Sequence, residues 1–238
     1  MIIFNRQFKP SWLMLFIMLS SVGLFAALGF WQLDRAGYKQ LVEDKYESRL
    51  AADYVPFKAT ENWSEIEYQK VILQGQFDTE RTLLLDNQLY KGRAGYHVIS
   101  PFTLSTGDVV LVNRGWVAAG VSRQILPAIE MPVNQNLARG VVTIPGDDIY
   151  RMGDIFLEGD WPQVIPFIDI PILQAEFESR LFPIVVWLGA EQQGAYIRDW
   201  QPVWLKPEKS RAYAWQWFAF AAIALILFFV LNLRKLHD

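Results

Sequence analysis

The stretch WLMLFIMLSSVGLFAALGFWQL, residues 12–33, carries no charged side chain and decides the fold class. At about 1.5 Å of rise per residue, it is long enough to cross a hydrocarbon core of about 30 Å. The alternative is a cleaved secretory signal, because Arg6 and Lys9 precede the stretch and Ala27-Leu28-Gly29 has the small residues of a cleavage site. The apolar run is longer than the roughly 7–15 residues of a signal core, which favours a retained membrane anchor.

A second apolar stretch, YAWQWFAFAAIALILFFVLNL, occupies residues 213–233. Its first residues carry amphipathic aromatic rings that suit the headgroup level of a bilayer, and no polar side chain interrupts residues 218–230. A surface helix of a soluble domain has a polar face, so this run predicts a second transmembrane helix. Two spans place residues 1–11 and 234–238 on the same side of the membrane, and both tails are basic. The sequence therefore predicts two cytoplasmic tails.

The connection between the spans, residues 34–212, is long enough to bury a core of its own as one extracytoplasmic domain. Four of the 22 Lys and Arg residues and one of the 25 Asp and Glu residues lie in the tails, which leaves 18 cations against 24 acids in the connection. This acidic balance argues against nucleic acid as a partner, because nucleic-acid-binding modules carry clustered basic residues. Loops longer than about 60 residues largely escape the charge rule, so basic residues in this connection do not reverse the predicted orientation.

Residues 34–52 carry apolar side chains at helical spacing among charges, so the first helix is predicted to continue out of the membrane and to end before Pro56. Thr106-Gly107-Asp108 is typical of a hairpin turn. Residues 172–182 are predicted to form a helix.

Short β-branched or aromatic runs, broken by Gly, Pro, Asn and Asp, predict serial strands from residue 68 onward. The predicted fold is therefore a mainly antiparallel α+β domain, shaped as a barrel or a sandwich, between two transmembrane helices. The predicted strands are KVILQGQF (70–77), RTLLLD (81–86), GYHVISPF (95–102), DVVLVNRGWV (108–117), ARGVVTIP (138–145) and PIVVWLGA (183–190).

The sequence contains no common catalytic signature. The chain has no cysteine, which excludes disulfides, thiolate metal sites and covalent c-type haem attachment. Its two histidines, His97 and His237, lie on opposite sides of the second span, so they cannot form a clustered imidazole site for a metal. The carboxylate pairs Glu43-Asp44 and Asp147-Asp148 fall in a predicted helix and a predicted turn, where solvated charge is the usual explanation. We therefore expect a protein that is not an enzyme.

Polar and aromatic side chains gather where a plain membrane anchor would not need them. Turn chemistry and the placement of cations at the interface can explain each of them singly. As a set, they are candidates for contacts with a partner. These candidates are Gln32, Asp86, Asn87, Gln88, Tyr90, Gly92, Arg93, Gly95, Tyr96, Asn113, Arg114, Gly115, Trp116 and Tyr213.

Four segments that follow one another along the chain carry a family resemblance. They are LGFWQLDRAGYK (28–39), LLLDNQLYKGRAGYHVISPF (83–102), VVLVNRGWV (109–117) and YAWQWFAFA (213–221). In this order and at these separations, they resemble the signature segments of the surfeit locus protein 1 family. The match extends from the first span to the second, and an ordered series is far more specific than one short motif.

The resemblance implies an assembly factor or chaperone for cytochrome c oxidase. Members of the family have two membrane helices with both ends on the cytoplasmic or matrix side, and they help to mature the haem-bearing subunit I. Bacterial members are similar to haem a chaperones. The implied partners are the lipid bilayer, oxidase subunit I and other assembly factors. Because the first span begins at residue 12 with no mitochondrial presequence before it, we expect a bacterial inner membrane with a periplasmic main domain.

The chain departs from the family at the position implied to bind haem iron. Family members commonly carry a histidine three residues before the tyrosine that opens the second helix, and here that residue is Ser210, which is not a usual axial ligand. Haem a as a cofactor would then depend on aromatic side chains that pack against the porphyrin, among them Trp12, and on cations near its propionates, among them Lys209. The iron would depend on the one imidazole of the outer domain, that of His97. The predicted haem contacts are Trp31, Arg35, His97, Arg211, Trp215 and Trp217.

Other interpretations remain open at this stage. His97 is alternatively a half-buried strand residue with local hydrogen bonds. The chain is alternatively a membrane-tethered docking or binding protein of the cell envelope, which stabilises an oxidase intermediate without binding haem. A sensing module is disfavoured, because its signal would have to pass through tails of about ten residues.

Overall fold

The computed structural model divides into two compact units, which are Met1–Lys45 with Gln201–Asp238, and Tyr46–Trp200. The structure describes residues 2–3, 6–8, 10–120, 125–130, 132, 135–146, 155, 157, 159–192, 196–198 and 206–235. The predicted turn at Asp147-Asp148 lies outside these residues.

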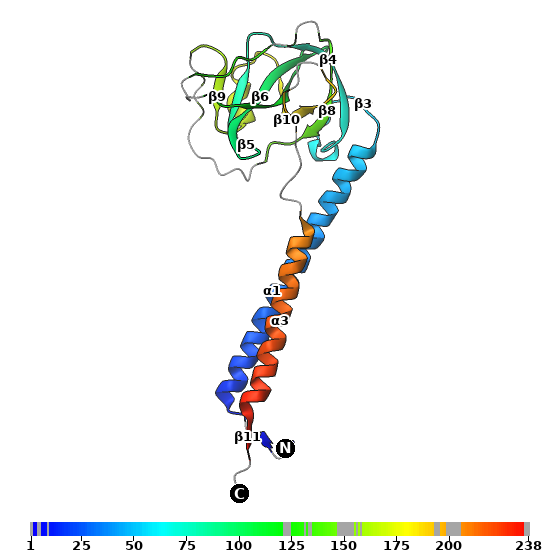
Figure 1. The fold of residues 1–238 in the computed structure, drawn as a ribbon. Coiled ribbons are helices and arrows are strands. Elements are labelled where there is room, and N and C mark those ends of the chain that lie inside the picture. The colour runs from blue at the N-terminus through cyan, green and yellow to red at the C-terminus, as the bar shows by residue number, and fades with distance from the viewer. Residues whose placement is uncertain are drawn as a thin grey trace. The chain divides into compact units, whose positions relative to one another are not determined.

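The first unit is a pair of long helices, α1 (Trp12–Ala51) and α3 (Pro207–Asn232), which run side by side (Figure 1). Both are long and apolar enough to cross a membrane. In the most apolar window of each helix only 6% and 17% of the residues are buried, so neither is the core helix of a soluble domain. α3 begins with Pro207, whose fixed φ and missing N–H suit the first turn of a helix. The prediction of two membrane helices is confirmed, while the boundaries of the embedded parts stay a prediction.

The predicted continuation of the first helix is also confirmed, because α1 runs without a break to Ala51. Its last turns belong to the second unit. There Nζ of Lys70 donates to the carbonyl oxygen of Leu50 at 3.2 Å, and Nη2 of Arg49 donates to that of Glu65 at 2.9 Å. Lys70 thus satisfies a carbonyl group in the last turn of α1, and Arg49 joins that turn to the segment around Glu65.

Short strands flank the helix pair. β1 (Ile2–Ile3), β2 (Arg6–Phe8) and β11 (Leu233–Lys235) form a small antiparallel sheet in the order β1-β2-β11. This sheet joins the two ends of the chain.

The second unit contains the remaining sheet, in the order β3-β4-β8-β10-β7-β6-β5-β9. Within the described residues β4 also pairs with β6, so that β4, β8, β10, β7 and β6 close into a barrel (Figure 1). The predicted barrel-like α+β domain is thus confirmed, with parallel pairings at β10–β7, β5–β9 and β3–β4. The strands are β3 (Val55–Pro56), β4 (Lys70–Phe77), β5 (Leu83–Tyr90), β6 (Arg93–Leu104), β7 (Val109–Ala118), β8 (Leu137–Thr143), β9 (Gln163–Ile165) and β10 (Leu181–Leu188), with a 3₁₀ turn at Trp63–Glu65.

The barrel closes at Gly75, where β4 changes its neighbour. Up to Gln74, β4 pairs with β8, and from Gly75 it pairs with β6. A Cβ at Gly75 would lie 1.9 Å from the carbonyl oxygen of Thr103, so only glycine allows this approach of the two backbones. Phe77 and Phe102, which are paired across β4 and β6, have buried side chains that face the barrel core.

All six predicted strands are present, the first with the predicted ends and the other five with shifted ends, and the predicted hairpin turn joins β6 to β7. The prediction of a helix over residues 172–182 is wrong beyond its first residues, because α2 covers only Ile170–Gln174. Oε1 of Gln174 accepts a hydrogen bond from N of Leu181 at 2.8 Å, and Leu181 already belongs to β10. Leu181 and Phe182 are buried in two different hydrophobic clusters of the domain, and this burial outweighs the local helical pattern.

Candidate functional site

The apolar parts of α1 and α3 pack closely. Gly29 provides the space, since a Cβ there would lie 2.5 Å from Cε1 of Phe218. Ala214 is fully buried, and the rings of Phe25 and Trp217 stack with their centroids 5.9 Å apart. Small side chains opposite aromatic rings are the arrangement that lets helices approach closely in lipid.

Two hydrogen bonds join the helices near the start of α3. Nζ of Lys39 donates to Oγ of Ser210 at 3.2 Å, and Nη2 of Arg211 donates to Oε1 of Gln40 at 2.9 Å. Ser210 is only 4% exposed. The position at which the family resemblance implies a histidine is therefore a buried contact between helices, occupied by a bonded hydroxyl group.

The predicted haem contacts on the helices are mostly exposed. Trp31 is 53% and Trp215 71% exposed, and Cζ of Arg35 lies 5.7 Å from the centroid of the Trp31 ring, within range of a cation–π contact. Trp217 is half-buried against α1. Of the other candidates on this helix pair, Gln32 is half-buried on α1 and Tyr213 is exposed on α3.

Trp12 does not belong to this group. It is the first residue of α1, and Trp31 lies 19 positions later on the same unbroken helix. At about 1.5 Å per residue, the two rings are separated by roughly 28 Å along the axis. The prediction that Trp12 shares a porphyrin surface with Trp31 is wrong.

His97 lies in the second unit, on β6, and is half-buried. Its ring meets that of Trp187 edge to face, with the centroids 5.0 Å apart. Burial lowers the pKa of His97 to about 4, so the imidazole is neutral at physiological pH. The side chain packs inside the barrel domain, while the other predicted haem contacts belong to the helix pair.

Residues 86–93 form the outer half of the β5–β6 hairpin, so the predicted end of the strand at Asp86 is wrong. β5 continues to Tyr90 through a register shift at which Asn87 adopts φ 59°. Lys91 and Gly92, with φ 47° and 77°, form a two-residue turn of the type that suits the twist of a hairpin. The remaining candidates of this segment are Asp86 and Gln88 on β5 and Arg93 on β6.

Trp116 joins this hairpin to β7. A Cβ at Gly95 would lie 2.4 Å from Cε2 of Trp116, so the indole rests directly on the glycine. Nε1 of Trp116 donates to the carbonyl oxygen of Gln88 at 2.9 Å, and its ring lies 5.3 Å from that of Tyr90. The structure therefore brings these four predicted residues together in one packed cluster.

Arg114 is fully buried behind this cluster. Its Nη1 donates to Oγ of Ser100 at 3.3 Å, its Nη2 donates to the carbonyl oxygen of Glu130, and its Cζ lies 5.2 Å from the centroid of the Tyr196 ring. Burial lowers the pKa of Arg114, and Tyr196 and Glu130 oppose that shift. The side chain ties β6 and two loops to β7.

The neighbours of Arg114 shape the end of β7. N of Gly115 donates to Oδ1 of the buried Asn113 at 2.9 Å, and Gly115 adopts φ 112°, a conformation that favours glycine. N of Trp116 then donates to the carbonyl oxygen of Ile197 at 2.7 Å. Tyr96, the last predicted residue, is buried in the same part of the domain.

Comparison with known proteins agrees with this arrangement. The model of the SURF1 family matches residues 19–222, which include most of both helices and the whole barrel domain. The chain belongs to the SURF1 family. Among its relatives, a SURF1-like protein of Dictyostelium discoideum is 31% identical over 102 residues (39% of this chain, 38% of the relative), and one of Rickettsia prowazekii is 28% identical over 123 residues (50% and 49%). The cytochrome oxidase assembly protein SHY1 of Saccharomyces cerevisiae is 32% identical over 98 residues (38% and 24%), so the matched parts span half or less of each of these relatives.

In this member of the SURF1 family, the side chains of the helix pair match the implied haem chemistry only in part. Exposed Trp31 and Trp215 and the cation of Arg35 fit the faces and propionates of a porphyrin. Neither helix contains a histidine or a cysteine, and Ser210 is buried in a hydrogen bond to Lys39. The helix pair therefore carries exposed aromatic and cationic side chains but no usual ligand for haem iron.

Some residues of this SURF1-family structure were not found from the sequence. Lys39, Tyr196 and the backbone of Glu130 hold segments that are far apart in the chain. Oη of Tyr196 accepts a hydrogen bond from N of Glu130 at 2.9 Å, and Arg114 binds the carbonyl oxygen of the same residue. Of these, only Lys39 carried a signal, because it stands within a segment of the family resemblance.

Proposed function

We propose that the protein is an assembly factor for cytochrome c oxidase that acts from the membrane. The match to the SURF1 family over residues 19–222 carries this proposal, because it includes the apolar helices as well as the barrel. One relative bears the name of a cytochrome oxidase assembly protein. A non-catalytic role agrees with a chain that has no cysteine and only two histidines.

The proposed arrangement has both tails in the cytoplasm of a bacterium and the barrel domain in the periplasm. Two spans return the chain to the side from which it starts. The basic tails favour the cytoplasmic side, and the charges of the long domain do not determine its side of the membrane, because the rule of positive cytoplasmic loops applies to short loops. Cysteine-labelling with a membrane-impermeant reagent tests this directly, because the chain has no cysteine of its own. A single cysteine at Asn62 is expected to react with the reagent in intact cells. A single cysteine at Gln7 is expected to react only after the inner membrane has been permeabilised.

The finer proposal is contact with subunit I during the insertion of haem a. Trp31, Arg35 and Trp215 support it as an exposed aromatic and cationic surface in the family's segments. The second candidate is docking onto an oxidase intermediate without haem. The buried hydrogen bond between Ser210 and Lys39 favours this candidate, because it occupies the position implied for an iron ligand.

Two measurements test these proposals. Deletion of the gene in its native host is expected to lower the haem a absorption of the membranes and the amount of assembled oxidase, and the full chain should restore both. Normal oxidase after deletion would contradict the assembly role. A visible spectrum of the detergent-purified protein, coexpressed with haem a synthesis, then separates the two candidates. A haem band that Trp31→Leu weakens supports haem contact, whereas a colourless protein that is still needed for oxidase assembly supports docking.

A further inference from the structure

The outer face of the barrel contains a cavity of about 540 Å³ at the place where β4 passes from β8 to β6. Side chains alternate along a strand, so Gln74 and Gln76 point outward while Leu73 and Phe77 point into the core. The register places Leu137 opposite Gln74 and Thr103 opposite Gln76, on the same outer face. The cavity is therefore a product of the barrel closure at Gly75.

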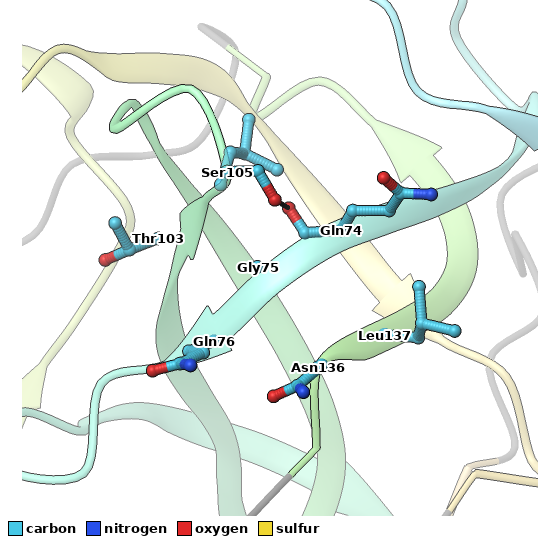
Figure 2. Close-up of a pocket in the computed structure, with 8 residues that line it drawn as sticks. Gln74, Gly75, Gln76, Thr103, Ser105, Asn136 and Leu137 are labelled. Atoms are coloured by element: carbon cyan, nitrogen blue, oxygen red, sulfur yellow. Dashed lines mark hydrogen bonds between the residues drawn. The ribbon is translucent and has the colours of Figure 1, made fainter.

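The lining of this cavity is neutral and rich in hydrogen-bonding groups. Figure 2 shows the carboxamides of Gln74, Gln76 and Asn136 around the seam, with Thr103 and Ser105 on the β6 side. Except for Ser105, whose Oγ donates to the carbonyl oxygen of Gln74 at 3.2 Å, these side chains form no hydrogen bond with any residue that the structure describes. Several exposed donors and acceptors thus remain available around one cavity.

A second cavity of about 220 Å³ adjoins the first and shares Gln74, Leu104 and Ser105 with it. Its lining includes the apolar side chains of Phe57, Ile72 and Phe182, of which Phe182 is almost fully buried, and one charged residue, Asp108. We call the two cavities together the seam groove. It combines a carboxamide-lined part with an adjoining pocket of a size that suits an apolar side chain.

These features distinguish between kinds of ligand. The described residues of the first cavity carry no charge, which disfavours phosphate groups, carboxylates and metal ions as ligands. They include no aromatic ring, and typical small-molecule pockets are mostly apolar, with few polar groups. A carboxamide offers a carbonyl acceptor and N–H donors, which complement the N–H and carbonyl groups of a peptide main chain. Proteins bind extended peptides through main-chain hydrogen bonds beside a sheet, with pockets for alternate side chains.

We propose that the seam groove binds an extended, uncharged polypeptide segment of a partner protein, with an apolar side chain in the pocket between Phe57 and Phe182. Under the proposed function, on which this step rests, the segment is an extracytoplasmic loop of oxidase subunit I. Gln76 and Asn136 are positioned to pair with the main chain of the segment.

The test measures binding to the full chain in detergent micelles. The probes are fluorescent synthetic peptides of about 15 residues that cover the extracytoplasmic loops of subunit I from the same host. We expect at least one peptide to bind and the double variant Gln76→Glu, Asn136→Asp to weaken it at least tenfold, since each change replaces an NH₂ donor with a negative oxygen. Gln69→Glu is the matched control, because it makes the same change just before β4 and lines neither cavity. An equal loss in the control, no binding of any peptide, or displacement of the peptide by the neutral sugar diacetylchitobiose overturns the proposal.

An experiment in cells separates this inference from the proposed function. A photo-crosslinking amino acid at position 76 is expected to attach to a loop of subunit I, identified by mass spectrometry. If deletion of the gene lowers oxidase content while the double variant supports normal oxidase, the groove proposal fails and the assembly role stands. If deletion leaves the oxidase normal, the assembly role fails and the groove loses its proposed partner as well.

Discussion

Replacement of Gly95 by alanine tests whether the segments GRAGY (92–96) and NRGW (113–116) stabilise the domain by packing against each other. The added Cβ would lie 2.2 Å from the carbonyl oxygen of Val117 and 2.4 Å from Cε2 of Trp116. The indole cannot move aside freely, because its Nε1 is bonded to Gln88 at 2.9 Å and its ring contacts Tyr90. Either the ring or the β6–β7 pairing must therefore shift.

The size of the effect follows from these two routes. Overpacking of a core costs about 1–3 kcal/mol. A displaced indole would also leave the Gln88 carbonyl group without its partner, at about 1–3 kcal/mol. The two costs overlap, so we expect Gly95→Ala to lower the free energy of unfolding of the barrel domain by about 2–4 kcal/mol. For a domain of this size, this lowers the melting temperature by roughly 5–15 °C.

The assay is thermal unfolding of the full chain in detergent, followed by near-ultraviolet circular dichroism of the aromatic rings. Gly37→Ala is the control, since a Cβ at Gly37 meets nothing within 4 Å. Alanine is more favourable than glycine in a helix by about 1 kcal/mol, so this variant should not be destabilised. A melting temperature for Gly95→Ala within about 2 °C of the unchanged protein would refute the reasoning. Trp116→Phe in the Gly95→Ala background should recover part of the loss, because the smaller ring relieves the contact.

Three further predictions concern the remaining contacts. Arg114→Met should destabilise the domain by about 2–4 kcal/mol and expose the Glu130 loop to protease, because it removes the hydrogen bonds of a buried cation to Ser100 and Glu130; unchanged cleavage would contradict the role of Arg114. Burial lowers the pKa of His97 from 6.5 to about 4, so between these pH values the unfolded chain binds a proton that the folded chain does not, and stability should fall as the pH drops from about 6.5 to 4. His97→Gln should reduce this dependence of the melting temperature on pH. An unchanged dependence would show that other groups cause it. Gly29→Val should separate α1 from α3 at Phe218 and lower the yield of monodisperse protein in detergent, whereas Gly23→Val, whose Cβ would meet nothing within 4 Å, should not.

The sequence predicts those parts of the fold that depend on local pattern. Uncharged runs mark the two membrane helices, and KVILQGQF coincides with β4. The closure of the barrel could not be predicted, because no local signal says that β4 leaves β8 for β6 at Gly75. The parallel pairing of β10 with β7 and the conversion of Leu181 from predicted helix to strand are likewise decided by contacts between distant segments.

The candidate site shows the same limit at the level of single residues. A polar and aromatic motif predicts that its residues matter, but it does not say whether they face a partner or one another. Arginine is usually a surface residue, but Arg114 is fully buried. A large aromatic residue is usually well buried, but Trp31 is 53% exposed. Burial depends on which strands and helices become neighbours, and that information is not local.

The exposed and buried motif residues therefore have different roles. Residues such as Gly95, Arg114 and Trp116 contact other residues of the barrel domain, so their presence identifies the scaffold, and a change there acts through stability. Contact with a partner requires side chains that reach solvent or lipid, as Trp31 and Trp215 do on the helix pair. The seam groove also meets this requirement, and it does so with residues that lie outside the family's signature segments or at their margin. If the assembly role and the groove are both correct, variants of the buried motif residues should lose oxidase in proportion to their loss of folded protein, whereas Gln76 variants should lose it at normal protein levels.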